Sequence, residues 1–312
     1  MNAADGQVNR VIARRLAEFV DRGPEMDLYT RVLDGNNYQI MMVSGATGMG
    51  KTSLLLRMVH ESAQRKLRKA EVTWTDTFVY DYTAVLRKLR DDLGLEHFGV
   101  FTDLINYYTD ANYQPRLDVR INVDSGQQSS VKVAEGSQIT GSSVGDIAGV
   151  LIRDNMFVVQ RPDIEVPVEV RRDELTRRFL AGLRETTANE RIVVFFDSFE
   201  KTSDTTERWV WEQLLPPVRD GQLPNVRWII CGQRRPPQDR DWLDFLARAE
   251  LKPLGASDIE AYIAKRVAGQ VEMSAETCRA LAGMVQVVTN GRPADVAEKV
   301  DLYLASERSR QI

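Results

Sequence analysis

A short apolar run, a glycine-rich stretch and an amphipathic segment follow one another near the start of this 312-residue chain. The apolar run covers Tyr38 to Val43 and reads as a strand, and Lys51 to Gln64 has helical periodicity. Between them stands Gly45-Ala46-Thr47-Gly48-Met49-Gly50-Lys51-Thr52, a full match to the pattern G-x-x-x-x-G-K-[ST]. The order strand, glycine loop, helix is the setting that this pattern requires, and it constrains the fold more than any other feature of the chain.

The residue types of this loop suit a polyphosphate. Glycines allow backbone N–H groups to turn inward around phosphate, and the start of the following helix adds a favourable dipole. Lys51 is expected to reach the β- and γ-phosphates, and Thr52 is expected to ligate Mg²⁺. The residues expected to contact the nucleotide are Gly45, Ala46, Thr47, Gly48, Met49, Gly50, Lys51, Thr52 and Ser53.

An acidic residue ends the most apolar segment of the chain. Residues Ile192 to Phe196 form a continuous apolar run of strand length, which is typical of a strand buried on both faces of a parallel sheet, and Asp197 follows. P-loop proteins anchor Mg²⁺ with an acidic residue at the tip of a neighbouring strand, so Asp197 is predicted to ligate the metal together with Thr52. An Asp that caps the next helix is the alternative interpretation.

Two further residues are candidates for catalysis. Glu200 stands three positions after Asp197, and a turn after the strand would bring its carboxylate to the attacking water. Many P-loop ATPases have this Glu directly after the Asp, where this chain has Ser198, so a solvent-exposed Glu is the alternative. Arg234 follows the strand predicted at residues 226–231 and is expected to bind the γ-phosphate, with a surface or interface arginine as its alternative.

Strands and helices alternate through the middle of the chain. Further strands are predicted at residues 72–80, 226–231 and 249–254, and helices at residues 8–20, 24–34, 83–93, 171–185 and 206–215. This alternation indicates an α/β fold, here a P-loop NTPase with a mainly parallel sheet flanked by helices. After Leu254 the pattern is all helical, and Ser257 with Glu260 forms a capping-box pattern at the first helix. Two more helices are predicted at residues 275–288 and 294–306.

The predicted organisation has three parts. Residues 1–36 form an N-terminal helical segment, residues 37–254 the α/β domain and residues 255–312 a small helical domain. An insertion at about residues 112–170 interrupts the α/β domain. Its stretch from Asp124 to Gly149 is rich in Ser, Gly and Gln, which predicts either a small hairpin or a mobile loop.

Trp209, Trp211 and Trp242 follow the strand that ends at Asp197. Because Trp209 and Trp211 are two positions apart, they cannot share one face of a helix, and one is expected to be more exposed than the other. Trp242 is expected in the core, with an interface as the alternative.

Charge and cysteine usage exclude several classes of protein. The chain has 41 Lys and Arg against 45 Asp and Glu, and a formal charge of −4 gives no global attraction to nucleic acid or to an anionic membrane. Two distant cysteines indicate free thiols rather than a disulfide framework, and two histidines leave little material for a metal cluster. The start lacks a signal-peptide core and no stretch approaches 18 apolar residues, so a cytoplasmic protein is expected.

Two short segments resemble motifs of the STAND ATPases, the signal-transducing P-loop group that includes NACHT proteins and apoptotic and plant-resistance ATPases. Phe19-Val20-Asp21-Arg22-Gly23-Pro24-Glu25-Met26 resembles their F-V-G-R-x-x-E-L segment, and Asn290-Gly291-Arg292-Pro293 resembles their G-x-P motif. The order of motifs also matches, over about residues 19 to 305 apart from the insertion. The resemblance implies that Val20 lies by the adenine and that Pro293 contacts the base, so the ligand is ATP or ADP. If the resemblance is set aside, Gly291-Arg292-Pro293 indicates only the end of one helix and the start of the next.

The chain departs from this family at two points. Asp21 stands where the N-terminal motif usually has Gly. No winged-helix domain with an M-H-D motif follows, because neither histidine lies beyond position 97. An excised ATPase core, or sensing and output supplied by other chains, is therefore expected.

The resemblance implies an ATP-binding, slowly hydrolysing switch that is closed with ADP and open with ATP. The expected partners are further copies of the chain, or an effector or sensor on another chain, whereas nucleic acid and membrane are not indicated. A role in prokaryotic defence is an analogy. Two alternatives stay open: an AAA-type ATPase that acts on DNA-bound complexes, and a nucleotide-binding scaffold that hydrolyses little or nothing, for which Ser198 is the motivating feature.

Overall fold

The computed structural model describes residues 12–20, 22–35, 38–75, 80–109, 150–153, 156–159, 166–234, 240–268 and 271–310. The chain divides into two compact units, Met1–Leu93 with Thr186–Ile312, and Gly94–Glu185. Asp21, Arg235 and the stretch from Asp124 to Gly149 lie outside the described residues. None of the helices formed by the described residues is both long and apolar enough to span a membrane.

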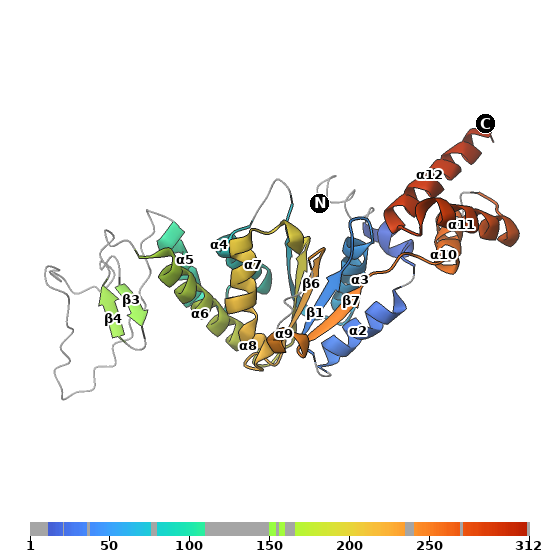
Figure 1. Cartoon of the computed structure of the whole chain (residues 1–312). Coiled ribbons are helices and arrows are strands. Elements are labelled where there is room, and N and C mark those ends of the chain that lie inside the picture. The colour runs from blue at the N-terminus through green and yellow to red at the C-terminus, as the bar shows by residue number, and fades with distance from the viewer. Residues whose placement is uncertain are drawn as a thin grey trace, which may run out of the picture. The chain divides into compact units, whose positions relative to one another are not determined.

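A parallel sheet forms the centre of the first unit (Figure 1). Its described strands lie in the order β2-β5-β6-β1-β7, and all neighbouring pairs are parallel. The bounds are β1 Ile40–Ser44, β2 Arg68–Thr73, β5 Ile192–Asp197, β6 Val226–Gly232 and β7 Leu246–Glu250. The central strands β5 and β6 are buried along their whole length, as expected for strands covered by helices on both faces. This confirms the predicted α/β fold class.

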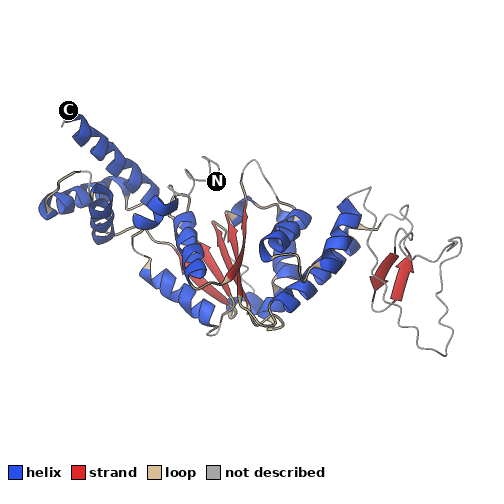
Figure 2. Ribbon diagram, turned by 180° about the vertical axis from the view of Figure 1, so that it is seen from behind, coloured by secondary structure: helices blue, strands red, loops and turns tan. Residues whose placement is uncertain are grey.

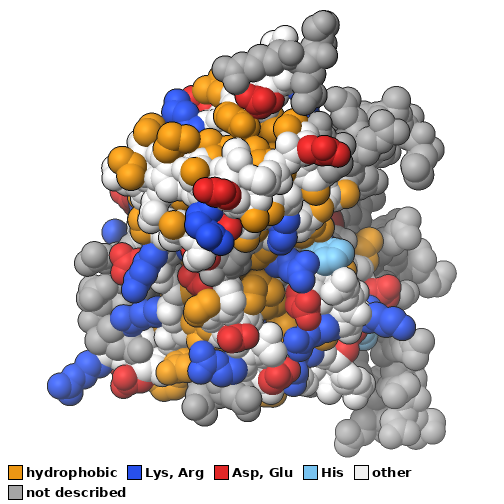
Figure 3. Space-filling model, turned by 90° about the vertical axis from the view of Figure 1, so that its right-hand side faces the viewer, with side chains coloured by type: hydrophobic (Ala, Val, Ile, Leu, Met, Phe, Trp, Pro, Cys, Tyr) orange, Lys and Arg blue, Asp and Glu red, His pale blue; other side chains and the backbone are white. Residues whose placement is uncertain are grey.

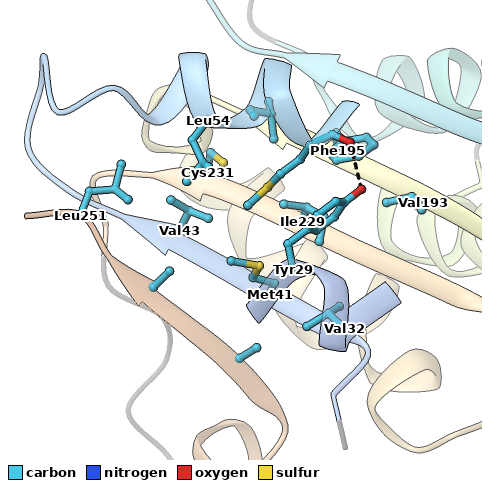
Figure 4. Packing of buried hydrophobic residues seen from close by; sticks show 14 of the residues in the cluster. Tyr29, Val32, Met41, Val43, Leu54, Val193, Phe195, Ile229, Cys231 and Leu251 are labelled. Atoms are coloured by element: carbon cyan, nitrogen blue, oxygen red, sulfur yellow. Dashed lines mark hydrogen bonds between the residues drawn. The ribbon is translucent and has the colours of Figure 1, made fainter. Parts of the chain in front are cut away.

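Helices α2 (Gly23–Asp34) and α3 (Lys51–Gln64) pack on one face of the sheet. Figure 4 shows the core between them, where Val193 and Phe195 of β5 and Ile229 of β6 are fully buried. The Tyr29 hydroxyl donates a hydrogen bond to the Met58 carbonyl oxygen at 3.1 Å and so links the two helices. This packing holds α2 and α3 together on the same face of the sheet.

Further helices cover the opposite face of the sheet (Figure 2), and aromatic side chains pack beneath them. The elements here are α4 (Tyr82–Leu93), η2 (Phe199–Lys201), α7 (Asp204–Trp209), η3 (Val210–Leu214), α8 (Pro216–Arg219) and α9 (Arg240–Leu243). The ring of Phe196 lies 5.0 Å from those of Trp74 and Trp228, centroid to centroid. Trp74 and Trp228 are both fully buried, so this face of the sheet is also dry.

The expected difference in exposure between Trp209 and Trp211 is small: Trp211 is the more exposed at 8% against 2%, and both are buried. The wider π-helical turn η3 begins between them. Trp209 packs against Tyr82, whereas Trp211 packs against Phe199 and Trp242. Neighbours therefore cover both sides of this segment, and Trp242 is buried as predicted.

After β7 the chain forms three helices with a core of their own, α10 (Ala256–Val267), α11 (Ala275–Thr289) and α12 (Pro293–Arg310). The predicted cap at Ser257 is wrong: α10 begins at Ala256, and Asp258 Oδ2 accepts from the Gly255 N–H at 2.8 Å. Hydrophobic side chains are exposed over this helical region (Figure 3), and Met284, Val287 and Val288 of α11 are among the exposed ones.

The second unit is described by itself. It contains α5 (Gly99–Thr109), most of α6 (Val168–Thr186), and an antiparallel pair of β3 (Val150–Arg153) and β4 (Met156–Val159). Phe98, Phe101 and Phe179 pack as a cluster of rings. The hairpin falls within the predicted insertion.

Two strands lie closer to the N-terminus than the sequence predicted. β2 covers Arg68–Thr73 rather than residues 72–80, because it is an edge strand whose buried positions are only Ala70 and Val72. β7 ends at Glu250 rather than 254. The apolar residues that follow it, Leu251 and Leu254, leave the sheet and pack in the two separate cores of this unit.

Candidate functional site

The glycine loop leaves β1 at the carboxyl edge of the sheet and leads into α3 at Lys51. Gly48 and Gly50 have φ of +82° and +87°, values that side chains other than glycine rarely adopt. Lys51 is buried, and its Nζ donates to the carbonyl oxygens of Gly45 at 2.8 Å and Ala46 at 3.1 Å. The ammonium group therefore lies across the loop.

Thr52 and Asp197 meet beside this loop. The Thr52 hydroxyl donates to Asp197 Oδ2 at 3.1 Å, and Oδ1 lies at 3.4 Å. Asp197 is 4% exposed, and burial raises the pKa of its carboxyl above the ordinary value, while hydrogen bonds from Thr52 and the Ser198 N–H oppose the shift. A hydroxyl and a carboxylate are hard oxygen ligands that fit Mg²⁺. No cluster of three or more His, Cys, Asp or Glu arranged for a metal occurs in the described part of the chain, so phosphate oxygens and waters would complete such a site.

The carboxylate of Glu200 lies at the end of the neighbouring strand. Ser198 adopts a left-handed φ of +56°, and the turn η2 carries Glu200 to the end of β6. There Glu200 Oε1 accepts from the Gln233 side-chain amide at 3.0 Å, and Oε2 accepts from the Gln233 N–H at 3.2 Å. Gln233 is a site residue that the sequence analysis missed, although a polar side chain directly after the β6 strand was a usable signal.

Arg234 turns to a different neighbour. Its guanidinium forms ion pairs with Glu207 and Asp204 of α7, and its side chain is 39% exposed. It is not among the residues that line the cavity beside the glycine loop. The structure therefore does not bring Arg234 to the loop, and its geometry fits the alternative of a surface arginine.

The N-terminal segment is attached to the loop through Arg22. This residue is 5% exposed, and its guanidinium donates to the carbonyl oxygens of Met49 at 3.1 Å and of Lys252 at 2.9 Å. Glu25 lies 3.8 Å from it. Arg22 is a second residue that the sequence analysis did not single out, although it was part of the quoted motif.

The helical region contacts the loop from another side. Arg292 Nε donates to the Thr47 carbonyl oxygen at 3.0 Å, and the Ala294 N–H donates to the Gly48 carbonyl oxygen at 3.1 Å. A Cβ added at Gly48 would lie 2.6 Å from Arg292 Nε and would displace the Arg292 side chain from the loop. The start of α12 thus rests directly on the loop backbone.

These elements enclose one cavity of about 590 Å³. Val20 from the N-terminal segment and Pro293 from the start of α12 both line it, as do the loop, Glu200 and Gln233. The lining also includes Glu18, Phe19, Arg22, Leu254, Tyr262, Arg266, Val296, Ala297 and Asp301. The structure therefore brings Val20, Pro293, Glu200 and residues Thr47 to Ser53 together around one space, with the Asp197 carboxylate against Thr52 at its wall.

Comparisons with known proteins support the fold. No protein-family model and no curated protein matches the sequence. The crystal structure of Cdc6p from Pyrobaculum aerophilum is similar at 13% identity with a TM-score of 0.51, over 94% of this chain and 64% of that chain. The structure of Drosophila ORC bound to DNA is similar at 12% identity with a TM-score of 0.48, over 96% of this chain and 60% of that chain. A STAND protein with a tetratricopeptide repeat sensor from Pyrococcus horikoshii is similar at 16% identity with a TM-score of 0.43, over 88% of this chain and 28% of that chain.

The chain spans less than two thirds of each of these proteins. At such identities a likeness shows the fold alone. Together with the parallel sheet and the loop before α3, the comparison shows that this chain has the fold of the P-loop ATPases.

Proposed function

We propose that the chain binds ATP and ADP in this cavity, hydrolyses ATP slowly, and works as a STAND-like switch. The observation that carries the proposal is the double contact of the helical region with the glycine loop, through Arg292 to Thr47 and Ala294 to Gly48. A nucleotide whose phosphates lie in the loop would be sensed by both parts of the chain at once.

The phosphates are assigned to the loop and to Lys51. Lys51 Nζ already lies over the loop on two carbonyl oxygens, and it would exchange these partners for β- and γ-phosphate oxygens. Thr52 and Asp197 are the residues that would hold Mg²⁺. When bound, Mg²⁺ supplies charge neutralisation on the phosphate oxygens. The apolar residues Val20, Pro293 and Leu254 are assigned to the base.

Glu200 is assigned to the attacking water. A carboxylate can accept the proton of that water only where it has a free lone pair and correct orientation. Both of its oxygens accept from Gln233, which holds the group at the end of β6. These hydrogen bonds also orient the carboxylate and use part of its capacity to accept from water, which supports slow hydrolysis.

Switching requires two states that the γ-phosphate distinguishes. The state with α12 on the loop is assigned to ADP. A γ-phosphate would enter near Gly48 and Gln233, and its charge would favour an arrangement in which the helical region releases the loop. Self-association of the ATP state is part of the proposal.

The first experiment is chromatography of the nucleotide that the purified protein releases on denaturation, followed by calorimetric titration of wild type and Lys51→Ala with ATP and ADP. Bound ADP and the loss of binding in Lys51→Ala are expected. Unchanged affinity in Lys51→Ala would reject the site. The switch is tested by light scattering with ADP and with a non-hydrolysable ATP analogue, where equal mass in both would reject assembly controlled by ATP.

A non-hydrolysing scaffold is the second candidate, and the double hydrogen bond from Gln233 to Glu200 favours it. Single-turnover hydrolysis separates the two. Loss of turnover in Glu200→Gln supports the slow ATPase, whereas equal background rates in wild type and Glu200→Gln support the scaffold.

A further inference from the structure

The cavity is lined by a cluster of charged and polar side chains to which the proposed phosphate binding gives no role. Glu18, Tyr262, Arg266 and Asp301 line the same cavity as the glycine loop. Glu18 Oε1 lies 3.2 Å from Arg266 Nη1, which joins the N-terminal segment to α10. Carboxylates repel phosphate oxygens, so Glu18 and Asp301 suit a different part of a bound nucleotide.

The hydrogen bonds within this group are unevenly distributed. Arg266 donates to Asp301 Oδ1 from Nη2 at 2.7 Å and from Nε at 3.0 Å. Glu18 Oε1 also lies 3.7 Å from Arg14 Nε. Neither Glu18 Oε2 nor the Tyr262 hydroxyl has a hydrogen-bond partner among the residues that the structure describes. The Glu18 side chain is only 18% exposed, and both residues line the cavity, so this wall of the cavity carries one acceptor and one hydroxyl without such a partner.

The hydroxyl stays protonated. Burial and the nearby carboxylates of Glu18 and Asp301 raise the pKa of Tyr262 above its ordinary value. Tyr262 is therefore a hydrogen-bond donor at neutral pH, next to Glu18, which only accepts.

The hydrogen-bonding types of this pair, one acceptor and one donor, are complementary to one edge of adenine. Adenine carries an amino donor beside a ring-nitrogen acceptor, whereas guanine and hypoxanthine carry an oxygen acceptor in place of that amino group. The geometry points to Glu18 and Tyr262 as the residues that select the base, with Glu18 accepting from the amino group of adenine and Tyr262 donating to a ring nitrogen. The inference rests on the proposed binding of a nucleotide, and it adds the reason why the base would be adenine.

The test compares ATP with ITP, which differs from ATP by the oxygen in place of the amino group. Affinities of both for wild type and Glu18→Gln are measured by competition in the presence of Mg²⁺. Wild type is expected to bind ATP at least about tenfold more tightly than ITP, the value of one well-placed hydrogen bond. Glu18→Gln presents an amide donor to the oxygen of ITP, so the ATP to ITP ratio is expected to fall towards one or below.

The ratio separates base selection from a general loosening of the cavity, because a broken contact with Arg266 would weaken both nucleotides alike. Tyr262→Phe should weaken ATP severalfold. Asp27→Asn removes one charge from an exposed residue of α2 outside the cavity and should leave the ratio unchanged. Equal ratios in wild type and Glu18→Gln would overturn the inference while leaving nucleotide binding intact. A wild type that binds neither nucleotide would instead reject the proposed function.

Discussion

Gly291 faces the backbone of Leu254 so closely that a Cβ on Gly291 would lie 2.2 Å from the Leu254 carbonyl oxygen. Gly291 has a φ of +70°, and the Leu254 N–H donates to its carbonyl oxygen at 2.8 Å. The next residue is Arg292, which reaches the Thr47 carbonyl oxygen. The segment that leads into α12 can lie this close to Leu254 only because residue 291 is glycine. This contact therefore sets where α12 meets the loop.

Gly291→Ala is expected to lower the free energy of unfolding by about 3 kcal/mol, since it combines left-handed strain with a backbone clash. The matched control is Gly283→Ala in α11, where an added Cβ meets nothing within 4 Å. That change should stabilise the protein by about 0.5–1 kcal/mol through helix propensity. Thermal and denaturant unfolding of both variants give the comparison. Equal effects of the two substitutions would contradict the assignment of a tight contact at Gly291.

The parts of the fold set by local patterns could be predicted from the sequence. The helix Lys51–Gln64 and the buried run that ends at Asp197 have the predicted bounds. The helix has strong periodicity and a clear start after the glycine loop, and the strand is a continuous apolar run that ends clearly at Asp197. The edge strand β2 was misplaced because only alternate residues are buried, and charged side chains such as Lys69 and Glu71 occupy the other positions.

Contacts between distant segments were the parts of the site that sequence reasoning missed. Gln233 meets Glu200 only because β5 and β6 are neighbours, and strand order is not written in local periodicity. Arg234 was assigned to the phosphate side because it follows a strand, yet the acidic residues of α7 offer it a nearer partner. Gln233 and Arg234 are thus neighbours in the chain, yet Gln233 contacts Glu200 whereas Arg234 contacts α7.

Asp197→Asn is expected to weaken Mg²⁺-dependent nucleotide binding by about tenfold or more, because it removes the charged ligand beside Thr52. The same change should stabilise the nucleotide-free protein at neutral pH. Burial raises the pKa of Asp197 above 3.8, so ionisation is harder in the folded chain than in the unfolded chain. The folded state is therefore weakened as pH rises through this range, and Asn removes that cost.

Melting temperatures of wild type and Asp197→Asn, measured between pH 4 and pH 8, test whether the substitution stabilises the nucleotide-free protein as expected. The gain from Asn should be present at neutral pH and shrink as the pH falls towards 3.8, because the carboxyl becomes protonated in the folded chain before it does so in the unfolded chain. Asp241→Asn, on an exposed residue, serves as the control for loss of one charge. A constant difference across the pH range, or unchanged Mg²⁺ dependence of nucleotide binding, would argue against a buried metal-binding carboxylate.

Gln233→Ala is expected to lower the rate of ATP hydrolysis by about tenfold with little change in ATP affinity, since Glu200 loses the side-chain donor that orients it. Glu200→Gln should cost about a hundredfold. Single-turnover rates and calorimetric affinities measure the two effects separately. Gln222→Ala is a suitable control on an exposed residue. A faster rate in Gln233→Ala would mean that these hydrogen bonds hold Glu200 in a resting position.

Arg22→Lys isolates the role of the guanidinium fork. Arg22 has a φ of +81°, and Lys at the same position carries the same backbone strain and the same charge, so the substitution changes only the geometry of the donors. A single ammonium group cannot reproduce the two bonds to Met49 and Lys252. We expect a loss of about 1.5–3 kcal/mol in the free energy of unfolding, as for hydrogen bonds of charged groups. Nucleotide affinity should fall as well, because Met49 belongs to the glycine loop.

The control is Arg31→Lys on the exposed side of α2, which should change neither stability nor affinity measurably. Denaturant unfolding and ATP titration of the two variants are the measurements. If Arg22→Lys unfolds and binds like Arg31→Lys, the guanidinium does not join the N-terminal segment to the loop. A loss of stability without a loss of affinity would show that the segment supports the fold but does not shape the loop, because the bond to Met49 is the only one of the two that reaches the proposed nucleotide site.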